Sequence, residues 1–423
     1  MNKKGSHKGS IPVVPELLAP AGNYEKLVTA IHYGADAVYL GGKGFSLRAK
    51  AGNFGDQAMR LGVEYAHAHG VKVYVTINII AHNSDLDGLE EYFLQLQRID
   101  VDGLIISDPG ILMMAQNRVP GLPVHLSTQA NVTNYGSAGF WLEHGAARLN
   151  LARELSLTEI REIRGKVRGE LEIFIHGAIC ISYSGRCMLS NYMTGRDANR
   201  GNCAHPCRYS YRLTEEKRPG EYFPVEEDDR GTYIFNSKDL CLLETLPQLV
   251  DAGVDSLKIE GRMKSIFYVG SVVRVYRAAL DYLGQLEARA WQAPELIRLP
   301  DELLQEIQRT GTRGATENFI KDRPGSGEMI YTSSRMEQVY EPVAVIRQTG
   351  VHPIVETRNT IFIGEHVEYM TRSIGEIPLE ITGMVDEEGR AMTKANPGNR
   401  LFLETYPLLD SGETNGILRR KKR

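Results

Sequence analysis

The stretch LEIFIHGAICISYSGRC, residues 171–187, joins a strand-like run to a loop that contains two cysteines. Residues two apart in an extended strand share a face. One face of this run is therefore apolar and carries Leu171, Ile173 and Ile175. The other face carries Glu172, Phe174 and His176. The pattern predicts a strand that packs on helices with one face and turns the other toward an interior.

Seven further runs resemble strands, and amphipathic stretches typical of helices fill the gaps between them. They are ELLAP, AVYLGG, VKVYVTIN, GLIISD, PVHLSTQ, RLNLAR and SLKIEGR, which start at Glu16, Ala37, Val71, Gly103, Pro123, Arg148 and Ser256. Alternating strands and helices imply a parallel sheet. Eight such units predict an α/β fold, a TIM-like (β/α)8 barrel.

Polar side chains gather at the ends of these runs. They are Asn78, Gln129, His176, Glu260 and, just past the last run, Arg262. In a barrel these positions lie at the C-terminal face, where barrel enzymes keep their active sites. Buried polar groups cost free energy unless they are paired or line a site. The polar interior is therefore either an active-site lumen or a satisfied buried network.

Four of the five cysteines follow the seventh run, with the spacing C-x6-C-x15-C-x3-C. They are Cys180, Cys187, Cys203 and Cys207. Four thiolates in one segment suit tetrahedral zinc or a four-cysteine iron–sulfur cluster, although zinc ribbons favour two tight pairs. Reactive or incidental thiols are a third reading. The fifth cysteine, Cys241, follows NSKDL on an apolar flank typical of a small buried side chain, or it replaces one of the four ligands.

A hydrolytic site is an alternative use of the same region. His176, Ser182 and Ser184 are close in sequence, and Asp239 follows further on. Neither serine has the G-x-S-x-G pattern of a nucleophile elbow. A Ser-His-Asp set is recognised by its geometry, so sequence proximity gives this reading little support.

The composition limits the classes of partner. The 423 residues carry a net charge of −4, which excludes a global basic field, so any nucleic acid must bind to a local patch. No apolar run approaches the ~18 residues of a membrane span, and the N-terminus lacks the core of a signal peptide. We expect a cytoplasmic protein with no membrane partner. Reduced cysteines then favour metal binding or catalysis over disulfides.

The sequence divides into five parts. We expect a flexible tail, the barrel, a helical connector, a small β-barrel domain and a basic tail at residues 1–11, 12–290, 291–335, 336–418 and 419–423. The long loop at 177–238 carries the cysteines, and loops of this length are usually functional. The small barrel either contacts RNA or only stabilises the chain. The terminal RRKKR is either frayed in solvent or an electrostatic arm for RNA.

Several blocks together resemble the peptidase U32 family. They are ELLAPAGNYEKL, GADAVYLGG, FIHGAICISYSGRC, NSKDL and GVDSLKIEGRMKS, and the likeness runs from about residue 12 to the end. Within the family, the chain is similar to the tRNA hydroxylation proteins, long described as collagenase-like proteases. One departure is TRGATENF at 312–319, where relatives tend to read RGYTEGF. The alternative function is that of a U32-type peptidase with a structural metal.

The resemblance implies a reaction, a cofactor and partners. It implies oxygen-independent formation of 5-hydroxyuridine at the wobble position of tRNA, with prephenate as a required metabolite. It implies a 4Fe-4S cluster on Cys180, Cys187, Cys203 and Cys207. Related members act as cluster-bearing heterodimers, so a paralogous U32-family subunit is a further candidate partner beside the tRNA anticodon loop.

Roles for the remaining candidates follow as hypotheses. We expect a catalytic function for His176, although a core or loop-orienting histidine is an equal alternative. Lys258, Glu260 and Arg262 are candidates for binding and turning over an anionic dicarboxylate such as prephenate, with Arg262 giving a bidentate grip. Asn78 and Gln129 are expected to bind substrate. The arginines of the cysteine loop, Arg186, Arg196, Arg200 and Arg208, either contact phosphates or hold the loop through hydrogen bonds to carbonyls.

Overall fold

The computed structural model describes residues 11–46, 53–179, 189–196, 198, 202–206, 213–214, 222–223, 226–228, 231–233, 236–311, 314–321, 329–330 and 338–422. The predictions for residues 1–10, for Cys180, Cys187 and Cys207, and for Arg186, Arg200 and Arg208 lie outside these residues. So do Ser182 and Ser184, and the first two residues of TRGATENF.

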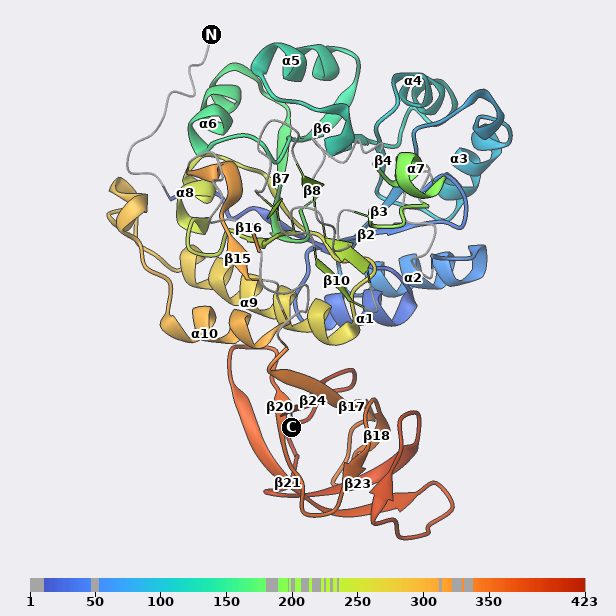
Figure 1. The fold of residues 1–423 in the computed structure, drawn as a ribbon, viewed down its shortest axis with the longest axis vertical. Coiled ribbons are helices and arrows are strands. Elements are labelled where there is room, and N and C mark those ends of the chain that lie inside the picture. The colour runs from blue at the N-terminus through green and yellow to red at the C-terminus, as the bar shows by residue number, and fades with distance from the viewer. Residues whose placement is uncertain are drawn as a thin grey trace.

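Eight parallel strands close into a barrel, as the sequence predicts (Figure 1). They are β1 (Glu16–Pro20), β2 (Ala37–Gly41), β3 (Lys72–Ile77), β4 (Gly103–Ile106), β5 (Val124–Leu126), β6 (Ala146–Asn150), β7 (Glu170–Gly177) and β14 (Ser256–Ile259). The last strand pairs with both β7 and β1, which closes the sheet. The predicted TIM-like barrel is therefore confirmed.

Helices between the strands cover the outside of the barrel. They are α1 (Tyr24–His32), α2 (Asp56–Ala68), α3 (Leu89–Arg98), α4 (Pro109–Arg118), α5 (Tyr135–Glu143), α6 (Leu157–Lys166), α8 (Leu246–Asp251) and α9 (Ile266–Gly284). Short polar side chains such as Asn23, Ser156 and Ser265 accept hydrogen bonds from first-turn amides and fix where helices begin. Single 3-10 turns lie at η1 (Asn83–Asp85) and η2 (Thr128–Ala130).

The alternation within the strands separates the two faces of the barrel wall. Leu171, Ile173, Leu257 and Ile259 are buried in the large apolar cluster that the outer helices cover. The opposite face turns inward, where Tyr39 and Tyr74 form a small apolar cluster of their own with Leu18, Ala37 and Ile105. The lumen is thus filled by a mixture of aromatic and charged side chains, described below.

Short elements lie after β7. These are α7 (Leu189–Thr194), β8 (Leu213–Thr214), β9 (Tyr222–Phe223), β10 (Glu226–Asp228), β11 (Gly231–Tyr233), β12 (Asn236–Ser237) and β13 (Asp239–Cys241). Strand β13 pairs antiparallel with the end of β7 and parallel with β15 (Ala315–Thr316), so residues of TRGATENF extend the sheet beside the mouth. The connector holds η6 (Ala290–Gln292), η7 (Pro294–Leu296), α10 (Asp301–Arg309), η8 (Asn318–Ile320) and β16 (Met329–Ile330).

The C-terminal residues form a second, closed barrel, in the strand order β17-β18-β23-β21-β20-β24. Its strands are β17 (Tyr340–Gln348), β18 (Ile354–Thr357), β20 (His366–Met370), β21 (Glu376–Asp386), β23 (Arg400–Tyr406) and β24 (Ile417–Lys421). The hairpin-like pair β19 (Ile361–Phe362) and β22 (Lys394–Ala395) adds to it. It has a separate apolar core.

The prediction of a basic tail is wrong for Arg419, Arg420 and Lys421. These residues belong to β24, which pairs with both β17 and β20 and closes the small barrel. Arg419 is fully buried and Arg420 is paired with Glu341 and Glu365. Paired carboxylates offset the cost of burying these charges. The residues are therefore structural, because strand pairing and ion pairs fix them.

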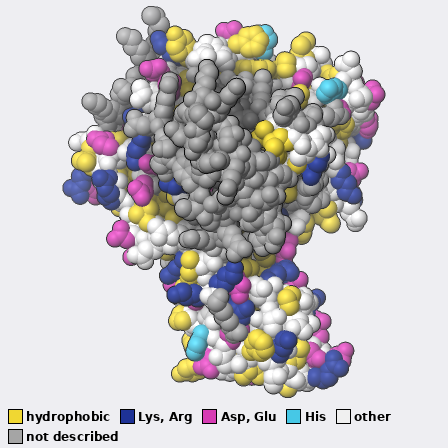
Figure 2. Space-filling model, viewed as in Figure 1, with side chains coloured by type: hydrophobic (Ala, Val, Ile, Leu, Met, Phe, Trp, Pro, Cys, Tyr) yellow, Lys and Arg dark blue, Asp and Glu magenta, His cyan; other side chains and the backbone are white. Residues whose placement is uncertain are grey.

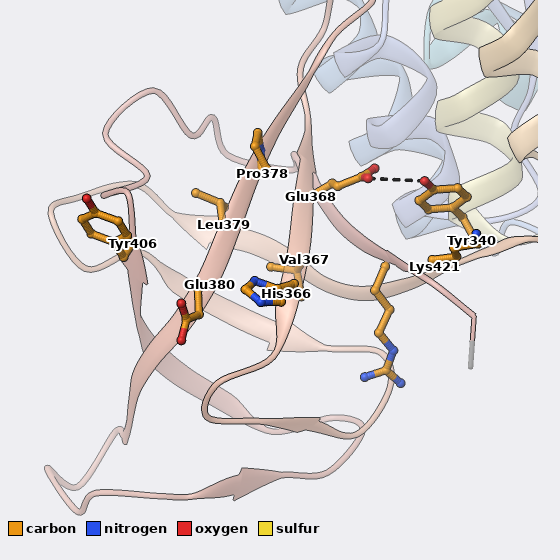
Figure 3. A pocket seen from close by; sticks show the side chains of 10 residues that line it. Tyr340, His366, Val367, Glu368, Pro378, Leu379, Glu380, Tyr406 and Lys421 are labelled. Atoms are coloured by element: carbon orange, nitrogen blue, oxygen red, sulfur yellow. Dashed lines mark hydrogen bonds between the residues drawn. The ribbon is translucent and has the colours of Figure 1, made fainter.

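The face of the small barrel formed by β20 and β21 is concave. A cavity of about 480 Å³ there is lined by Tyr340, His366, Glu368, Glu380 and Tyr406, among others (Figure 3). The Tyr340 hydroxyl donates to Glu368 at 3.4 Å. Figure 2 shows Lys and Arg side chains gathered where the two barrels meet, with acidic side chains beside them. The predicted contact between this domain and RNA stays a prediction.

Among the described residues, no helix is long and apolar enough to cross a membrane.

Candidate active site at the barrel mouth

The lumen contains a network of buried charges centred on Glu172 of β7. The Lys258 ammonium donates to one carboxylate oxygen of Glu172 at 2.8 Å, and Arg148 lies 3.5 Å from the other. Arg148 also binds Glu16 and Glu170. Opposite charges in one buried cluster compensate each other when all partners are present. The charge of Lys258 is therefore compensated by Glu172 inside the lumen. This pairing supports the interpretation that the charges around Glu172 form a satisfied buried network.

Two polar atoms of the same interior have no hydrogen-bond partner among the described residues. They are His125 Nδ1 and Asn150 Oδ1, and both residues are almost fully buried. Burial, followed by the charge of Arg148, holds the pKa of His125 well below its usual range, so the ring is neutral. Neutral acceptors and donors without partners are typical of a site that binds water or a ligand. The lumen is thus only partly satisfied.

Asn78 and Gln129 come together at the mouth, although they lie in different βα units. The Asn78 amide donates to Gln129 Oε1 at 2.9 Å, and the Gln129 amide donates to the Asn78 carbonyl at 3.2 Å. Ser127 donates to the same Oε1 at 2.6 Å. These bonds fix both amide orientations, so the pair forms a preorganised polar edge at the C-terminal face.

Arg262 also lies at the mouth and is only 3% exposed. Its guanidinium donates to the hydroxyls of Ser46 and Thr76, at 2.8 and 3.1 Å, and its carbonyl accepts from Lys26 at 3.1 Å. A guanidinium is charged at neutral pH, and these two hydroxyls fix its orientation. Glu260, in the same segment, accepts from the Tyr39 hydroxyl at 3.4 Å. Glu260 and Arg262 therefore occupy the predicted face, whereas Lys258 lies below it.

The prediction that His176 shares the lumen face of β7 is wrong. Phe174 pairs with Lys258, but His176 pairs with Ile259, so the register shifts by one residue between them. Such a bulge re-aims the following side chain. His176 packs against two tyrosines of α9, with ring centroids 5.9 Å from Tyr268 and 5.6 Å from Tyr276. Burial lowers its pKa to about 4 and keeps the imidazole neutral.

Gly177, the next residue, takes a backbone angle that favours glycine and lies against Glu260. Its φ is 108°, and a Cβ there would lie 2.6 Å from the Glu260 carbonyl oxygen. We expect Gly177→Ala to cost about 1–2 kcal/mol for the left-handed backbone plus about 1–3 kcal/mol for the clash. Gly389→Ala is the matched control, since Gly389 has φ 83° and open space around it. Urea unfolding measures both, and equal costs would remove the crowding argument.

Cys203 is the predicted cluster ligand that the structure describes. The thiol is partly exposed, and the His205 amide donates to its sulfur at 3.3 Å. Amides directed at sulfur are a common feature of iron–sulfur sites, where they tune the potential. Arg196 donates to Asn202 and to the Cys203 carbonyl, at 3.1 and 3.4 Å. Arg196 thus holds the loop through a hydrogen bond to a carbonyl, which was the structural alternative to a phosphate contact. The environment of Cys203 is compatible with a soft metal ion.

Cys241 has a different environment. Its sulfur lies 3.8 Å from the Tyr276 hydroxyl, and it pairs in register with His176. Burial raises the pKa of the thiol, so it remains protonated. A protonated thiol beside a neutral imidazole is a poor nucleophile pair. The structural reading of Cys241 fits these contacts best.

Sequence reasoning missed Arg153, which follows β6. Its guanidinium carbon lies 3.9 Å from the centre of the Phe174 ring, and its Nη1 donates to the Ala178 carbonyl at 3.1 Å. A positional signal existed, because Arg153 lies three residues after β6 as Arg262 lies three residues after β14. An arginine just past a barrel strand is placed to reach over the mouth.

Comparisons with known proteins cover most of the chain. The family model of peptidase family U32 matches residues 22–330, and that of the U32 C-terminal domain matches residues 339–419. The chain is 42% identical over 385 residues to tRNA hydroxylation protein P1 of Bacillus subtilis (strain 168), over 90% of this chain and 89% of that protein.

Two further relatives match at similar levels. The chain is 37% identical to tRNA hydroxylation protein P of Escherichia coli (strain K12), over 91% of this chain and 92% of that protein. It is 44% identical to an uncharacterized protease of Methanocaldococcus jannaschii, over 96% of this chain and 99% of that protein. The two family models together span the barrel with its connector and the small C-terminal barrel, and the chain belongs to peptidase family U32.

Proposed function

We propose that this protein is an iron–sulfur enzyme that hydroxylates C5 of the wobble uridine of tRNA, with prephenate as co-substrate and without molecular oxygen. One observation carries the proposal: relatives that share about nine-tenths of their length with this chain are named tRNA hydroxylation proteins. Cytoplasmic localisation and a paralogous U32-family partner subunit remain part of this proposal.

Cys180, Cys187, Cys203 and Cys207 are the proposed ligands of a 4Fe-4S cluster. The partly exposed Cys203 thiol, with an amide directed at its sulfur, supports this assignment. When bound, such a cluster supplies electron transfer, which an oxidation of C5–H to C5–OH requires. The protein's own contribution is to bind the base and the co-substrate beside the cluster and to exclude water.

The mouth offers complementary groups for a uracil base. The edge of uracil presents two carbonyl acceptors around one N–H donor, and the fixed Asn78–Gln129 amide pair offers both donors and acceptors. A base in an anticodon loop is already partly unstacked, so the cost of moving it into a pocket is small. Arg262 supplies a buried positive charge at the same face for an anionic co-substrate. Glu260 is the candidate proton acceptor among the predicted catalytic residues.

A U32-type peptidase is the second candidate function, because the M. jannaschii relative is named a protease. The contacts around His176 give it little support. Its ring is neutral and packs on α9, and the neighbouring Cys241 thiol is protonated. A nucleophile needs an adjacent base within hydrogen-bond reach and an orienting group. The next experiment distinguishes hydroxylation of tRNA from cleavage of proteins.

The test is mass spectrometry of tRNA nucleosides from a strain that lacks this gene. We expect 5-hydroxyuridine and its derivatives to disappear, to return with the wild-type gene, and to stay absent with Cys187→Ser. A strain that cannot make prephenate should show the same loss with the wild-type gene present. Unchanged nucleosides in the deletion strain would contradict the proposal and bring the peptidase forward, with casein or collagen cleavage as its assay.

A further inference from the structure

Arg153 forms a second cationic position at the mouth of the barrel. Its guanidinium stacks on the ring of Phe174, whose side chain belongs to the inward face of β7. Stacking on an aromatic ring holds the planar group in one orientation and leaves its edge open for hydrogen bonds. Within the described part of the chain, the acceptor that its side chain meets is the Ala178 carbonyl, which takes only Nη1.

The charge of Arg153 is not compensated within the described part of the chain. The other cations of the lumen have carboxylate partners: Arg148 binds Glu16 and Glu170, and Lys258 binds Glu172. Arg153 has no such partner there, and its Nε is shielded from solvent without an acceptor. A buried donor without a partner costs free energy. That cost is recovered when a ligand supplies the acceptor.

We propose that Arg153 binds a carboxylate of the small organic acid that serves as co-substrate, on the side of the mouth away from Arg262. The inference rests on the proposed function and adds a second binding group to it. Arg262 is anchored on the β2–β3 side through Ser46 and Thr76, whereas Arg153 lies over β7. Two guanidinium groups on different sides of one mouth match a dicarboxylate, because each can bind one carboxylate bidentately.

The position of Arg153 favours a small acid over an RNA phosphate. Phe174 is only 8% exposed, and the shielded Nε lies against it inside the rim. A phosphodiester belongs to a bulky strand and stays at the surface, where arginines are solvated. A free carboxylate enters the lumen together with its carbon skeleton, and the neutral His125 and Asn150 side chains below accept further contacts.

Isothermal titration of anaerobically purified, cluster-loaded protein with prephenate tests the inference. We expect Arg153→Met to weaken binding by at least about tenfold, because one charge-assisted bidentate contact is lost. Arg153→Lys should fall between, since lysine lacks the planar fork. Arg161→Met is the matched control, because Arg161 pairs with Asp251 in an exposed position on α6. This variant should bind prephenate as the wild type does.

The outcomes separate this inference from the function on which it rests. If the wild type binds no prephenate, the proposed co-substrate fails. If the wild type binds it and both Arg153 variants bind equally well, the role of Arg153 is overturned. The iron content of each variant reports whether it folds and holds its cluster. If Arg153→Met loses the cluster, Arg153→Lys, which keeps the positive charge, replaces it in the comparison. Filter binding of tRNA completes the set, because a loss of tRNA affinity with unchanged prephenate affinity would assign Arg153 to a phosphate and overturn the proposal.

Discussion

Cys203→Ser should remove the iron–sulfur cluster and reduce 5-hydroxyuridine in tRNA to the level of the deletion strain. A serine hydroxyl is a hard, protonated group at neutral pH and does not replace a thiolate on iron. The amide of His205 that now donates to the sulfur would still find an oxygen acceptor, so the loop itself should persist. Iron and acid-labile sulfide per chain, measured after anaerobic purification, check the first effect, and nucleoside mass spectrometry checks the second.

Cys241→Ser is the matched control for that experiment. Cys241 is half-buried, its thiol lies beside the Tyr276 hydroxyl, and burial raises the pKa of the thiol, so the group is held protonated in a structural contact. A serine there can hydrogen-bond the same tyrosine hydroxyl, and we expect iron, sulfide and 5-hydroxyuridine near wild-type amounts. If Cys203→Ser kept a full cluster, Cys203 would not be a ligand. A loss with Cys241→Ser would instead identify Cys241 as a replacement ligand.

Glu306→Gln should cause a large loss of stability at the junction of the two barrels. Glu306 of α10 is buried and pairs with Arg274 of α9 at 2.6 Å, with Arg419 of β24 at 2.5 Å and with Arg309 at 3.1 Å. Removing one partner from a buried ionic cluster leaves uncompensated charge and costs about 3–5 kcal/mol. Thermal unfolding followed by circular dichroism should therefore show a melting temperature lower by several degrees.

The control for Glu306→Gln is Glu287→Gln. Glu287 pairs with Arg289, and both side chains are largely exposed, at 74% and 83%. Exposed pairs contribute about 0–1 kcal/mol, so this variant should unfold almost as the wild type does. Equal melting temperatures for the two variants would show that the junction does not depend on the carboxylate of Glu306.

The same carboxylate should make stability depend on pH. Burial alone would raise the pKa of Glu306, but the hydrogen bond from Arg419 and the charges of Arg274, Arg419 and Arg309 outweigh it and lower the pKa. Its contribution is therefore complete above the usual pKa of a glutamate and is lost as the pH falls through the lowered value. The stability difference between wild type and Glu306→Gln should shrink in acid.

Much of the fold follows from local patterns in the sequence. The alternation in LEIFIHG and in SLKIEGR places Leu171, Ile173 and Leu257 under the helices and Glu172 and Lys258 inside, as the structure shows. The strand ends also predict that Asn78 and Gln129 lie at the mouth, and the structure adds the hydrogen bond between them. These features are local because the side-chain period of a strand is two residues wherever the strand lies.

Local periodicity therefore predicts the eight strands, the faces of most of their residues and the end of the barrel that carries the candidate site. Contacts between segments set which neighbour each side chain meets. His176 leaves the lumen because β7 shifts register against β14, and Lys258 is neutralised by Glu172, 86 residues away in the chain. Arg419 lies in a barrel strand and meets Glu306, 113 residues distant, so this residue of the basic terminus is buried. Periodicity is a property of one segment, whereas register and charge pairing depend on contacts between distant segments that the sequence does not specify locally.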